Sequence, residues 1–234
     1  MNQEVIKALI ITGELEIEGR LVDASNATLL AHINGPNGEQ ISVIYKPIAG
    51  ERPLWDFPDG NLASREVAAY EFSENAGFHV VPFTVMRDGP FGPGAVQQWI
   101  DVDQESDVVT IAQSDLPAMR KMALFDAIVN NTDRKFGHIL VSPDGTIFGC
   151  DHGVTFHEDD KLRTVLWQWS GNKLTRDEAI QLERIDSELD DWDLQKYLTT
   201  PEILAIHARI SKIRECNEFP VPSQEWPAVP WPPF

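Results

Sequence analysis

Residues 121–156 read KMALFDAIVNNTDRKFGHILVSPDGTIFGCDHGVTF, and this stretch decides the fold. An apolar helical run ends at its Asn-Asn pair, and two short apolar strands at 139–142 and 146–150 follow, joined by a Pro-Asp-Gly turn. Asp133 precedes this hairpin and Asp151 follows it. Because the ends of paired strands lie side by side, we expect the two carboxylates to converge. Phosphotransferases use such a layout to hold a base and a metal ligand over one phosphate.

Composition sets the broad class of the protein. A chain of 234 residues with 42% apolar and 24% charged residues can bury a substantial core and is typical of globular proteins. Its 37 acidic residues against 19 basic ones give a formal charge of −18, which disfavours nucleic acid and anionic bilayers as electrostatic partners. Two cysteines, Cys150 and Cys216, form neither a disulfide framework nor a zinc spacing. Without a signal-like or membrane-length apolar run, we expect a cytoplasmic protein with no integral membrane association.

The first half of the chain is predicted to be rich in strands. Residues 4–11 form a short helix or a strand, and the pattern leaves both open. Alternating or β-branched apolar residues predict strands at 14–21, 29–33, 41–45, 80–86 and 95–100. Between them, residues 62–76 carry a broad apolar face and predict a helix. Residues 101–107 are acidic and poor in apolar side chains, as expected of a connector between two lobes.

The second half is predicted to be mainly helical. A long helix should begin after a cap at Ser114 or Asp115, and further helices are expected at 177–187 and 201–216, with residues 162–169 buried. The last 15 residues hold six prolines and two tryptophans, which indicates an extended tail, either packed on the body or free. The sequence therefore predicts one α+β domain with a β-rich N-lobe (1–101), a mainly helical C-lobe (102–219) and a Pro/Trp-rich tail (220–234).

Two more residues complete a possible catalytic set. Lys46 ends a predicted strand, and Glu66 lies 20 residues later on the helix of the N-lobe, as an ion-paired partner would. Taken singly, each has an ordinary alternative: Asp133 as a cap, Asp151 as a turn residue, and the other two as solvated surface charges. Together they stand in the order of the protein-kinase lysine, helix glutamate, catalytic aspartate and metal aspartate.

The motifs around these residues resemble those of the phosphatidylinositol 3-/4-kinase-like superfamily, above all type II phosphatidylinositol 4-kinases and their bacterial relatives. The resemblance covers about residues 15–160. Its motifs are Tyr45-Lys46-Pro47, Arg65-Glu66-Val67-Ala68-Ala69-Tyr70, Val81-Pro82, Asp126, Asn131-Thr132-Asp133-Arg134 and Asp151-His152-Gly153. Including residues 52–58 (RPLWDFP), the whole chain resembles an uncharacterised bacterial family grouped with these kinases.

This resemblance implies a two-lobed atypical protein or lipid kinase-like fold and a set of roles. Lys46 would bind the phosphates of ATP with Glu66 as its partner, the Asp133-Arg134 pair would be catalytic, and Asp151 would bind Mg²⁺ or Mn²⁺. The loop at Ser25-Asn26 would cover the phosphates, although it has no G-x-G-x-x-G. Gln98 and Trp99 would belong to the hinge that meets the adenine through backbone groups.

One position departs from the family pattern. Where these kinases carry an asparagine that binds a second metal, this chain has His138. Neutral imidazole suits Mn²⁺ or Zn²⁺ better than Mg²⁺. His138 is therefore a metal ligand with altered preference, a phosphate contact, or a packed residue in a site without fast transfer. A zinc site built from His138, Asp151, His152 and His157 is a rival interpretation, which lacks both a helical His-x-x-x-His and a cysteine pair.

The sequence thus predicts an ATP-dependent phosphotransferase, with a protein or small-molecule hydroxyl as the preferred acceptor. The alternative is a catalytically weak pseudokinase that acts as a nucleotide-binding interaction module. The expected partners are a nucleotide and an unidentified phosphate acceptor, and the sequence leaves the oligomeric state open.

Overall fold

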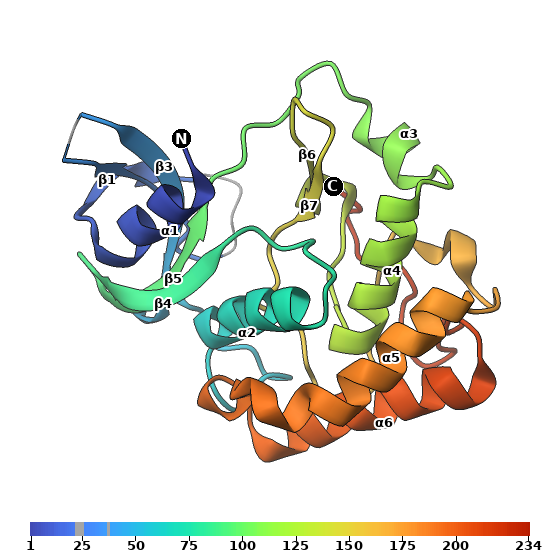
Figure 1. Ribbon diagram of the computed structural model, residues 1–234. Helices are drawn as coiled ribbons and strands as arrows, with labels where there is room; N and C mark the ends of the chain where they lie inside the picture. The colour runs from blue at the N-terminus through green and yellow to red at the C-terminus, as the bar shows by residue number, and fades with distance from the viewer. Residues whose placement is uncertain (22–25, 37) are drawn as a thin grey trace.

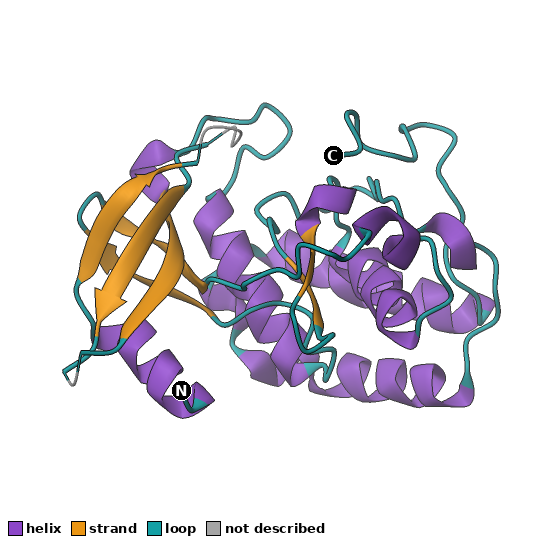
Figure 2. Ribbon diagram, turned by 90° about the horizontal axis from the view of Figure 1, so that it is seen from above, coloured by secondary structure: helices purple, strands orange, loops and turns teal. Residues whose placement is uncertain are grey.

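The computed structural model describes residues 1–21, 26–36 and 38–234, and it divides into two lobes (Figure 1). The N-lobe is a five-stranded antiparallel sheet flanked by helices, and the C-lobe is mainly helical (Figure 2). The sequence-based prediction of an α+β, two-lobed architecture is confirmed. The grouping follows from the pattern of the chain, since strands come first and helices follow.

The N-lobe sheet has the strand order β1-β2-β3-β5-β4. Its strands are β1 (Leu15–Arg20), β2 (Leu29–Asn34), β3 (Gln40–Pro47), β4 (Thr84–Gly89) and β5 (Gly92–Gln98). Alternate residues of β2 (Leu29, Ala31 and Ile33) are buried, so one face of the sheet forms a small core. Helix α1 (Gln3–Thr12) covers that face through Ile10, which settles the open choice for this segment in favour of a helix.

Two predicted strands of the N-lobe are shifted in the structure. The strand expected at residues 80–86 begins at Thr84, because Val80 is bonded elsewhere: its N–H donates to Ser73 Oγ and its carbonyl accepts from Gly149. Val80 therefore joins the two lobes instead of the sheet. The strand expected at 95–100 ends at Gln98, two residues early, and begins earlier at Gly92.

Helix α2 (Leu62–Asn75) lies between the sheet and the C-lobe, and Asn61 caps it by accepting from the N–H of Ser64. Ten of its 14 residues are buried, among them the charged Arg65 and Glu66. A helix covered on nearly all sides can bury charges only if they are paired. Both are paired: Arg65 with Glu202 of the C-lobe, and Glu66 with Lys46 of β3 in the N-lobe.

The C-lobe helices are α3 (Val108–Ala112), α4 (Pro117–Val129), α5 (Arg176–Glu188) and α6 (Thr200–Cys216). The short α3 was not expected from sequence; Asp107 caps it by accepting from two backbone N–H groups. The predicted cap of α4 was wrong, because Leu116 occupies that position and Pro117 begins the helix. Asp115 instead accepts a hydrogen bond from the indole Nε1 of Trp169 at 2.9 Å.

The predicted hairpin is present as β6 (Ile139–Val141) and β7 (Ile147–Gly149), antiparallel with Leu140 opposite Phe148. The Pro/Trp-rich tail packs on the body rather than hanging free: the carbonyl of Ala228 accepts from the indole of Trp167 at 2.7 Å. Within the described residues, no helix is both long and apolar enough to cross a membrane.

Candidate nucleotide and catalytic site

Three elements bring opposite charges together where the lobes meet. Lys46 of β3 donates from Nζ to Oε1 of Glu66 on α2 and to Oδ1 of Asp151 after β7, the latter at 2.9 Å. The side chain of Glu66 is 3% exposed, whereas that of Asp151 is 54% exposed. The lysine is therefore anchored on its buried side and faces an accessible carboxylate on the other.

Glu66 also ties α2 to the segment after β7. Its second oxygen, Oε2, accepts the backbone N–H of His152 at 3.1 Å. Gly153 follows, and a Cβ built there would lie 3.2 Å from the Cβ of Leu62, so the chain passes close to the helix. One carboxylate thus fixes both the lysine and the backbone beside Asp151.

The pKa values of this cluster follow its geometry. Burial alone would lower the pKa of Lys46, but the carboxylates of Asp151 and Glu66 outweigh it and raise the pKa. The Lys46 ammonium, together with His138, holds the pKa of Asp151 well below its ordinary value despite the opposing effect of burial. Both groups are charged at neutral pH, as phosphate and cation binding require.

Asp133 lies in the loop between α4 and β6, which we call the catalytic loop (residues 131–138). Its backbone N–H donates to Asn131 Oδ1 at 3.0 Å, and its carboxylate lies 3.2 Å from the ammonium of Lys135. The side chain of Asp133 is 30% exposed, so it can reach a substrate. Lys135 was not singled out from sequence, since a lysine in a loop gives no signal of its own.

Arg134 occupies a different environment from its neighbour. It is completely buried, and all five of its N–H bonds point to acceptors. Two go to the carboxylate of Asp126 at 2.9 Å each, two to the carbonyls of His138 and Cys150, and one to His152 Nε2. The catalytic role expected for Arg134 stays a prediction; its buried guanidinium joins the catalytic loop to the β6–β7 hairpin.

His138 lies between the two aspartates. Its Nε2 is 3.6 Å from Asp151 Oδ2, and its carbonyl accepts the N–H of Cys150 at 3.0 Å, which continues the hairpin ladder. Burial lowers the pKa of His138, while the charges of Asp151 and Asp133 act in the opposite direction, so the imidazole is neutral at pH 7. Asp151 Oδ2 thus lies 3.6 Å from this ring, and the charge of Asp133 influences the pKa of the same ring, as expected if the two aspartates converge.

Unsatisfied polar atoms gather at the same place. Four buried side-chain atoms of the described residues have no hydrogen-bond partner, and three of them surround the catalytic loop: His138 Nδ1, His152 Nδ1 and Arg163 Nε. Such orphans are rare in folded proteins. A zinc cluster does not account for them, because the part of the chain that the structure describes holds no group of three or more His, Cys, Asp or Glu side chains placed to bind a metal.

The other residues predicted to bind nucleotide are Ser25, Asn26, Gln98 and Trp99, and those that the structure describes have protein partners. Asn26 Oδ1 accepts the backbone N–H of Arg52 at 2.9 Å, and Ser25 is outside the described residues. The backbone N–H of Gln98 donates to the carbonyl of Phe83 and that of Trp99 to the carbonyl of Ser42. These two N–H groups are already paired, and the expected contact of the hinge backbone with adenine stays a prediction.

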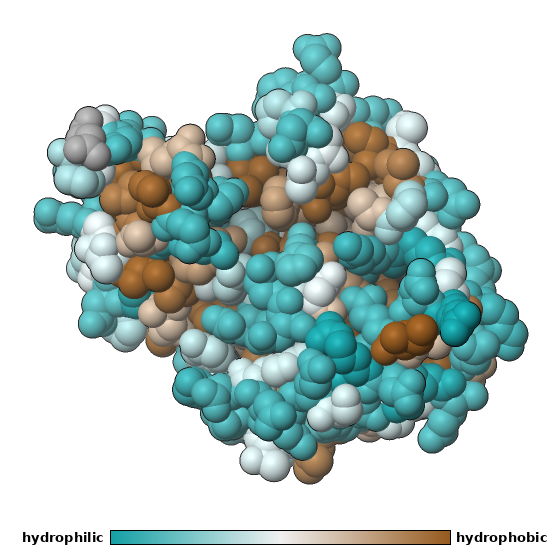
Figure 3. Space-filling view, in the orientation of Figure 1, coloured by the Kyte–Doolittle hydropathy of each residue, from teal (hydrophilic) through white to brown (hydrophobic). Residues whose placement is uncertain are grey.

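Gln98 and Trp99 do border a hollow. They line a cavity of about 670 Å³ whose other walls come from α1, α2 and the β6–β7 turn, and Lys46 and Asp151 are not among its walls. Figure 3 shows this face, with hydrophobic side chains gathered where the two lobes meet. Because neither Lys46 nor Asp151 lines it, the cavity is distinct from the space at the charged cluster.

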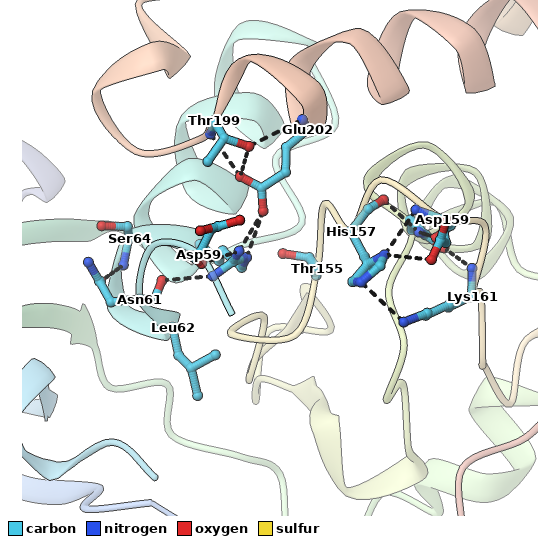
Figure 4. Close-up of polar contacts among 12 residues, drawn as sticks. Asp59, Asn61, Leu62, Ser64, Thr155, His157, Asp159, Lys161, Thr199 and Glu202 are labelled. Atoms are coloured by element: carbon cyan, nitrogen blue, oxygen red, sulfur yellow. Dashed lines mark hydrogen bonds and ion pairs between the residues drawn. The ribbon is translucent and has the colours of Figure 1, made fainter. Parts of the chain in front are cut away.

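A second ion pair fixes the lobes and was missed from sequence. Arg65, next to Glu66 on α2, donates from Nε and Nη2 to Oε1 of Glu202, and both side chains are buried. Glu202 also takes part in the capping of α6 with Thr199, as Figure 4 shows. Neighbouring residues of one helix therefore bind two different parts of the C-lobe.

Comparison with known proteins agrees with this fold. No protein-family model matches the chain. Protein Rv2133c of Mycobacterium tuberculosis is 35% identical over an alignment of 267 positions, which covers 97% of this chain and 95% of that protein. The chain belongs to the family of Rv2133c.

Among solved structures, the similarity is to kinases of atypical type. Hydra Fam20 with sugar has a TM-score of 0.59 at 13% identity, covering 90% of this chain and 86% of that one. The Golgi casein kinase with Mn/ADP bound gives 0.56 at 13% identity, covering 92% and 76%, and the Helicobacter pylori proinflammatory kinase CtkA gives 0.50 at 11%, covering 90% and 94%. At such identities the likeness establishes an atypical kinase-like fold, and it does not single out the phosphatidylinositol 3-/4-kinase branch.

Proposed function

We propose that the protein is an ATP-dependent phosphotransferase that acts on a hydroxyl group, of the phosphatidylinositol 3-/4-kinase-like type suggested by its motifs. The observation that carries the proposal is the contact of Lys46 with both Glu66 and Asp151 across the lobes, 20 and 105 residues apart in the chain. A lysine between two carboxylates at a lobe boundary is the arrangement that phosphoryl transfer uses to bind phosphate and a cation. The fold shared with atypical kinases supports the same conclusion.

In this proposal the N-lobe binds the nucleotide phosphates. Lys46, oriented by Glu66, neutralises phosphate oxygens and leaves Asp151 free for a cation when the nucleotide enters. The buried contact of Glu66 with the N–H of His152 keeps the two lobes in register. Lys46 therefore exchanges one carboxylate for phosphate while it retains the other.

The catalytic loop acts on the acceptor. Asp133 accepts the proton of the attacking hydroxyl, and Lys135, at 3.2 Å from its carboxylate, places positive charge beside the transferred phosphoryl group. Arg134 acts as a positioning residue, because it fixes the loop between α4 and the hairpin without touching solvent. The rate therefore depends on Asp133 directly and on Arg134 through geometry.

Asp151 and His138 fit a divalent cation shared with the nucleotide. The carboxylate of Asp151 is half exposed, and the neutral imidazole of His138 lies 3.6 Å from it. Nucleotide-bound Mg²⁺ and Mn²⁺ take only one or two protein ligands and complete their shell from phosphate oxygens and water, so a pair of side chains suffices. When bound, the cation would neutralise the charge of the phosphates; a nitrogen ligand favours Mn²⁺ over Mg²⁺.

A thermal-shift titration with ATP and either Mg²⁺ or Mn²⁺ tests the proposal. A ligand that binds only the folded state stabilises it by about 2.7 kcal/mol at a hundred times its Kd, which corresponds to roughly 5–10 °C in Tm for a chain of this size. We expect Asp151→Asn to lose most of this shift and Asp191→Asn, an exposed aspartate of the C-lobe, to retain it. The absence of a shift with every nucleotide and metal pair would refute nucleotide binding.

A second function, a pseudokinase that binds nucleotide without fast transfer, is favoured by His138 alone. A neutral, largely buried imidazole replaces an oxygen ligand in the second metal position. ADP release from ATP in the presence of Mn²⁺ distinguishes the two: a phosphotransferase loses turnover in Asp133→Asn while keeping its nucleotide shift. Turnover that is absent in the wild type, or unchanged in the variant, would favour the pseudokinase.

A further inference from the structure

The end of the tail lies along the catalytic loop. We call residues 226–234 the strap. The carbonyl of Pro233 accepts the N–H of Phe136 at 2.8 Å, and the ring of Phe234 lies 5.3 Å from that of Phe136. In Figure 1 the C-terminus accordingly lies beside the β6–β7 hairpin. The strap therefore ends next to the loop that carries Asp133.

The strap also pairs with the segment after Asp151. The carbonyl of Ala228 accepts the N–H of Thr164 at 3.1 Å. Thr164 itself forms a parallel bridge with Arg134, and the carbonyl of Arg163 accepts the N–H of Arg134 at 3.1 Å. Three backbone segments thus lie side by side and are joined by hydrogen bonds: Arg134, residues 163–164, and Ala228 of the strap.

Lys161 fastens the other end of the strap. Its ammonium lies 4.9 Å from the ring centre of Trp226 and 5.7 Å from that of Trp55, which belongs to the N-lobe loop before α2. His157 Nε2 is 3.1 Å away, as Figure 4 shows, and Asp56 completes the group. Lys161 is 5% exposed, although the ring of Trp55 is largely exposed, so this residue joins both lobes and the strap through a buried ammonium.

These contacts occupy the groups that a polypeptide acceptor would use. Extended peptides bind other proteins chiefly by adding to unpaired backbone groups along an edge, with side-chain pockets for specificity. Here the N–H groups of Phe136 and Thr164 already donate to the strap. A peptide could reach Asp133 along this edge only by displacing the strap and its aromatic contacts.

Beside this edge lies Arg163, which forms no ion pair with the residues that the structure describes. Arg163 is fixed by its backbone, whose N–H donates to the carbonyl of Asn131 and whose carbonyl accepts from Arg134, one residue on either side of the Thr132-Asp133 pair. Its Nε is buried and has no hydrogen-bond partner among the described residues. A guanidinium in that state is suited to a carboxylate or phosphate group.

We propose that the phosphate acceptor is a small alcohol bearing an anionic group, bound by Arg163, and that the strap is a fixed wall that excludes polypeptides. This inference rests on the proposed phosphotransferase function. In the reaction, a bond forms between the acceptor hydroxyl oxygen and the γ-phosphorus of ATP. The bond from that phosphorus to the β–γ bridging oxygen breaks, ADP leaves, and the hydroxyl proton passes to Asp133.

The test measures transfer from γ-labelled ATP by the full chain with Mn²⁺. The acceptors are three classes of probe: anionic alcohols (glycerate, glycerol 3-phosphate, glucose 6-phosphate and serine), the uncharged alcohols glycerol, glucose and myo-inositol, and a degenerate Ser/Thr/Tyr peptide pool. We expect the wild type to label one or more anionic alcohols and neither of the other classes. Arg163→Gln should raise the acceptor KM at least tenfold while the KM for ATP changes less than twofold.

Two variants of the strap test whether it excludes polypeptides. Trp226→Ala with Phe234→Ala removes both aromatic anchors, and Phe234→Ala alone is the milder variant if the first does not fold. We expect peptide labelling to rise at least tenfold with an unchanged KM for ATP. Trp231→Ala, which alters a strap side chain that is 86% exposed, is the matched control and should behave as the wild type.

The outcomes separate this inference from the function on which it rests. Peptide labelling by the wild type, or a strap variant that labels peptides no better than Trp231→Ala, would refute the claim that the strap excludes polypeptides. Labelling that favours uncharged alcohols, or an unchanged acceptor KM in Arg163→Gln, overturns the anionic class. If the wild type binds ATP and labels none of the three classes, the inference fails while nucleotide binding stands. If ATP does not bind at all, the proposed function itself fails.

Discussion

Replacing Arg134 by methionine should lower the free energy of unfolding more than a substitution of a surface residue does. The guanidinium is completely buried and supplies five hydrogen bonds, two of them to the equally buried carboxylate of Asp126. In Arg134→Met, the Asp126 carboxylate keeps only the side-chain amide of Asn131 as a partner within hydrogen-bond distance. Breaking a buried pair in this way costs about 3–5 kcal/mol. For a chain of this size that loss corresponds to roughly 6–20 °C in Tm.

Urea unfolding followed by the fluorescence of the seven tryptophans measures the effect. Arg184→Met is the matched control, because Arg184 pairs with Glu188 one helical turn away and both side chains are about 40% exposed or more. Including its hydrogen bond to the exposed carbonyl of Asn75, we expect a loss of only about 1 kcal/mol. The double variant Arg134→Met with Asp126→Leu removes the stranded charge and should recover stability relative to the single variant. A loss below about 1 kcal/mol in Arg134→Met, or a double variant less stable than the single one, would refute this reasoning.

Three further predictions concern charge and metal. Glu66→Gln removes the charge that orients Lys46 and should raise the Kd for ATP about tenfold by calorimetry, which corresponds to about 1.4 kcal/mol; an unchanged Kd would contradict the role given to this pair. His138→Asn supplies an oxygen ligand, so ATP turnover with Mg²⁺ should rise several-fold relative to turnover with Mn²⁺, and an equal response to both metals would show that this side chain does not select the cation. Burial would lower the pKa of His207, but its hydrogen bonds to Asp186 and a second aspartate outweigh burial and raise it. Because the pKa of His207 is higher in the folded protein, its protonation contributes fully to the free energy of unfolding below the unfolded pKa of about 6.5. This contribution disappears as the pH rises through the folded pKa. The difference in free energy of unfolding between wild type and His207→Gln should therefore shrink between about pH 6 and pH 8.

Local patterns predicted the elements that frame the site. The apolar runs and the Pro-Asp-Gly turn gave the β6–β7 hairpin, and that hairpin brings the carboxylates of Asp133 and Asp151 close enough for both to act on His138. The order of Lys46 and Glu66 in the chain led us to expect that Glu66 holds the lysine, and the structure contains this ion pair. The direct contact of Lys46 with Asp151 was not predicted, because Asp151 was expected to bind a metal.

Contacts that depend on distant residues could not be predicted. The sequence around Arg134 does not show that distant acceptors, among them Asp126 and Cys150, use all five of its N–H donors. The motif in which it lies therefore suggested a catalytic role, whereas its hydrogen bonds are structural. The pairing of the hinge N–H groups depends on the registers of β3 and β4, and the place of the strap depends on Lys161. A proline-rich segment has no periodicity from which its partner can be read.

The position of Phe234 has a practical consequence. Its ring packs on Phe136, so any polypeptide joined after Phe234 begins beside the loop that carries Asp133. A purification tag or reporter joined there would crowd the acceptor side, whereas one joined before Gln3 would emerge from α1, on the sheet of the other lobe. Tests of the proposed function should therefore use protein that carries its tags at the N-terminal end, and a loss of activity caused by a C-terminal fusion should be checked against such protein.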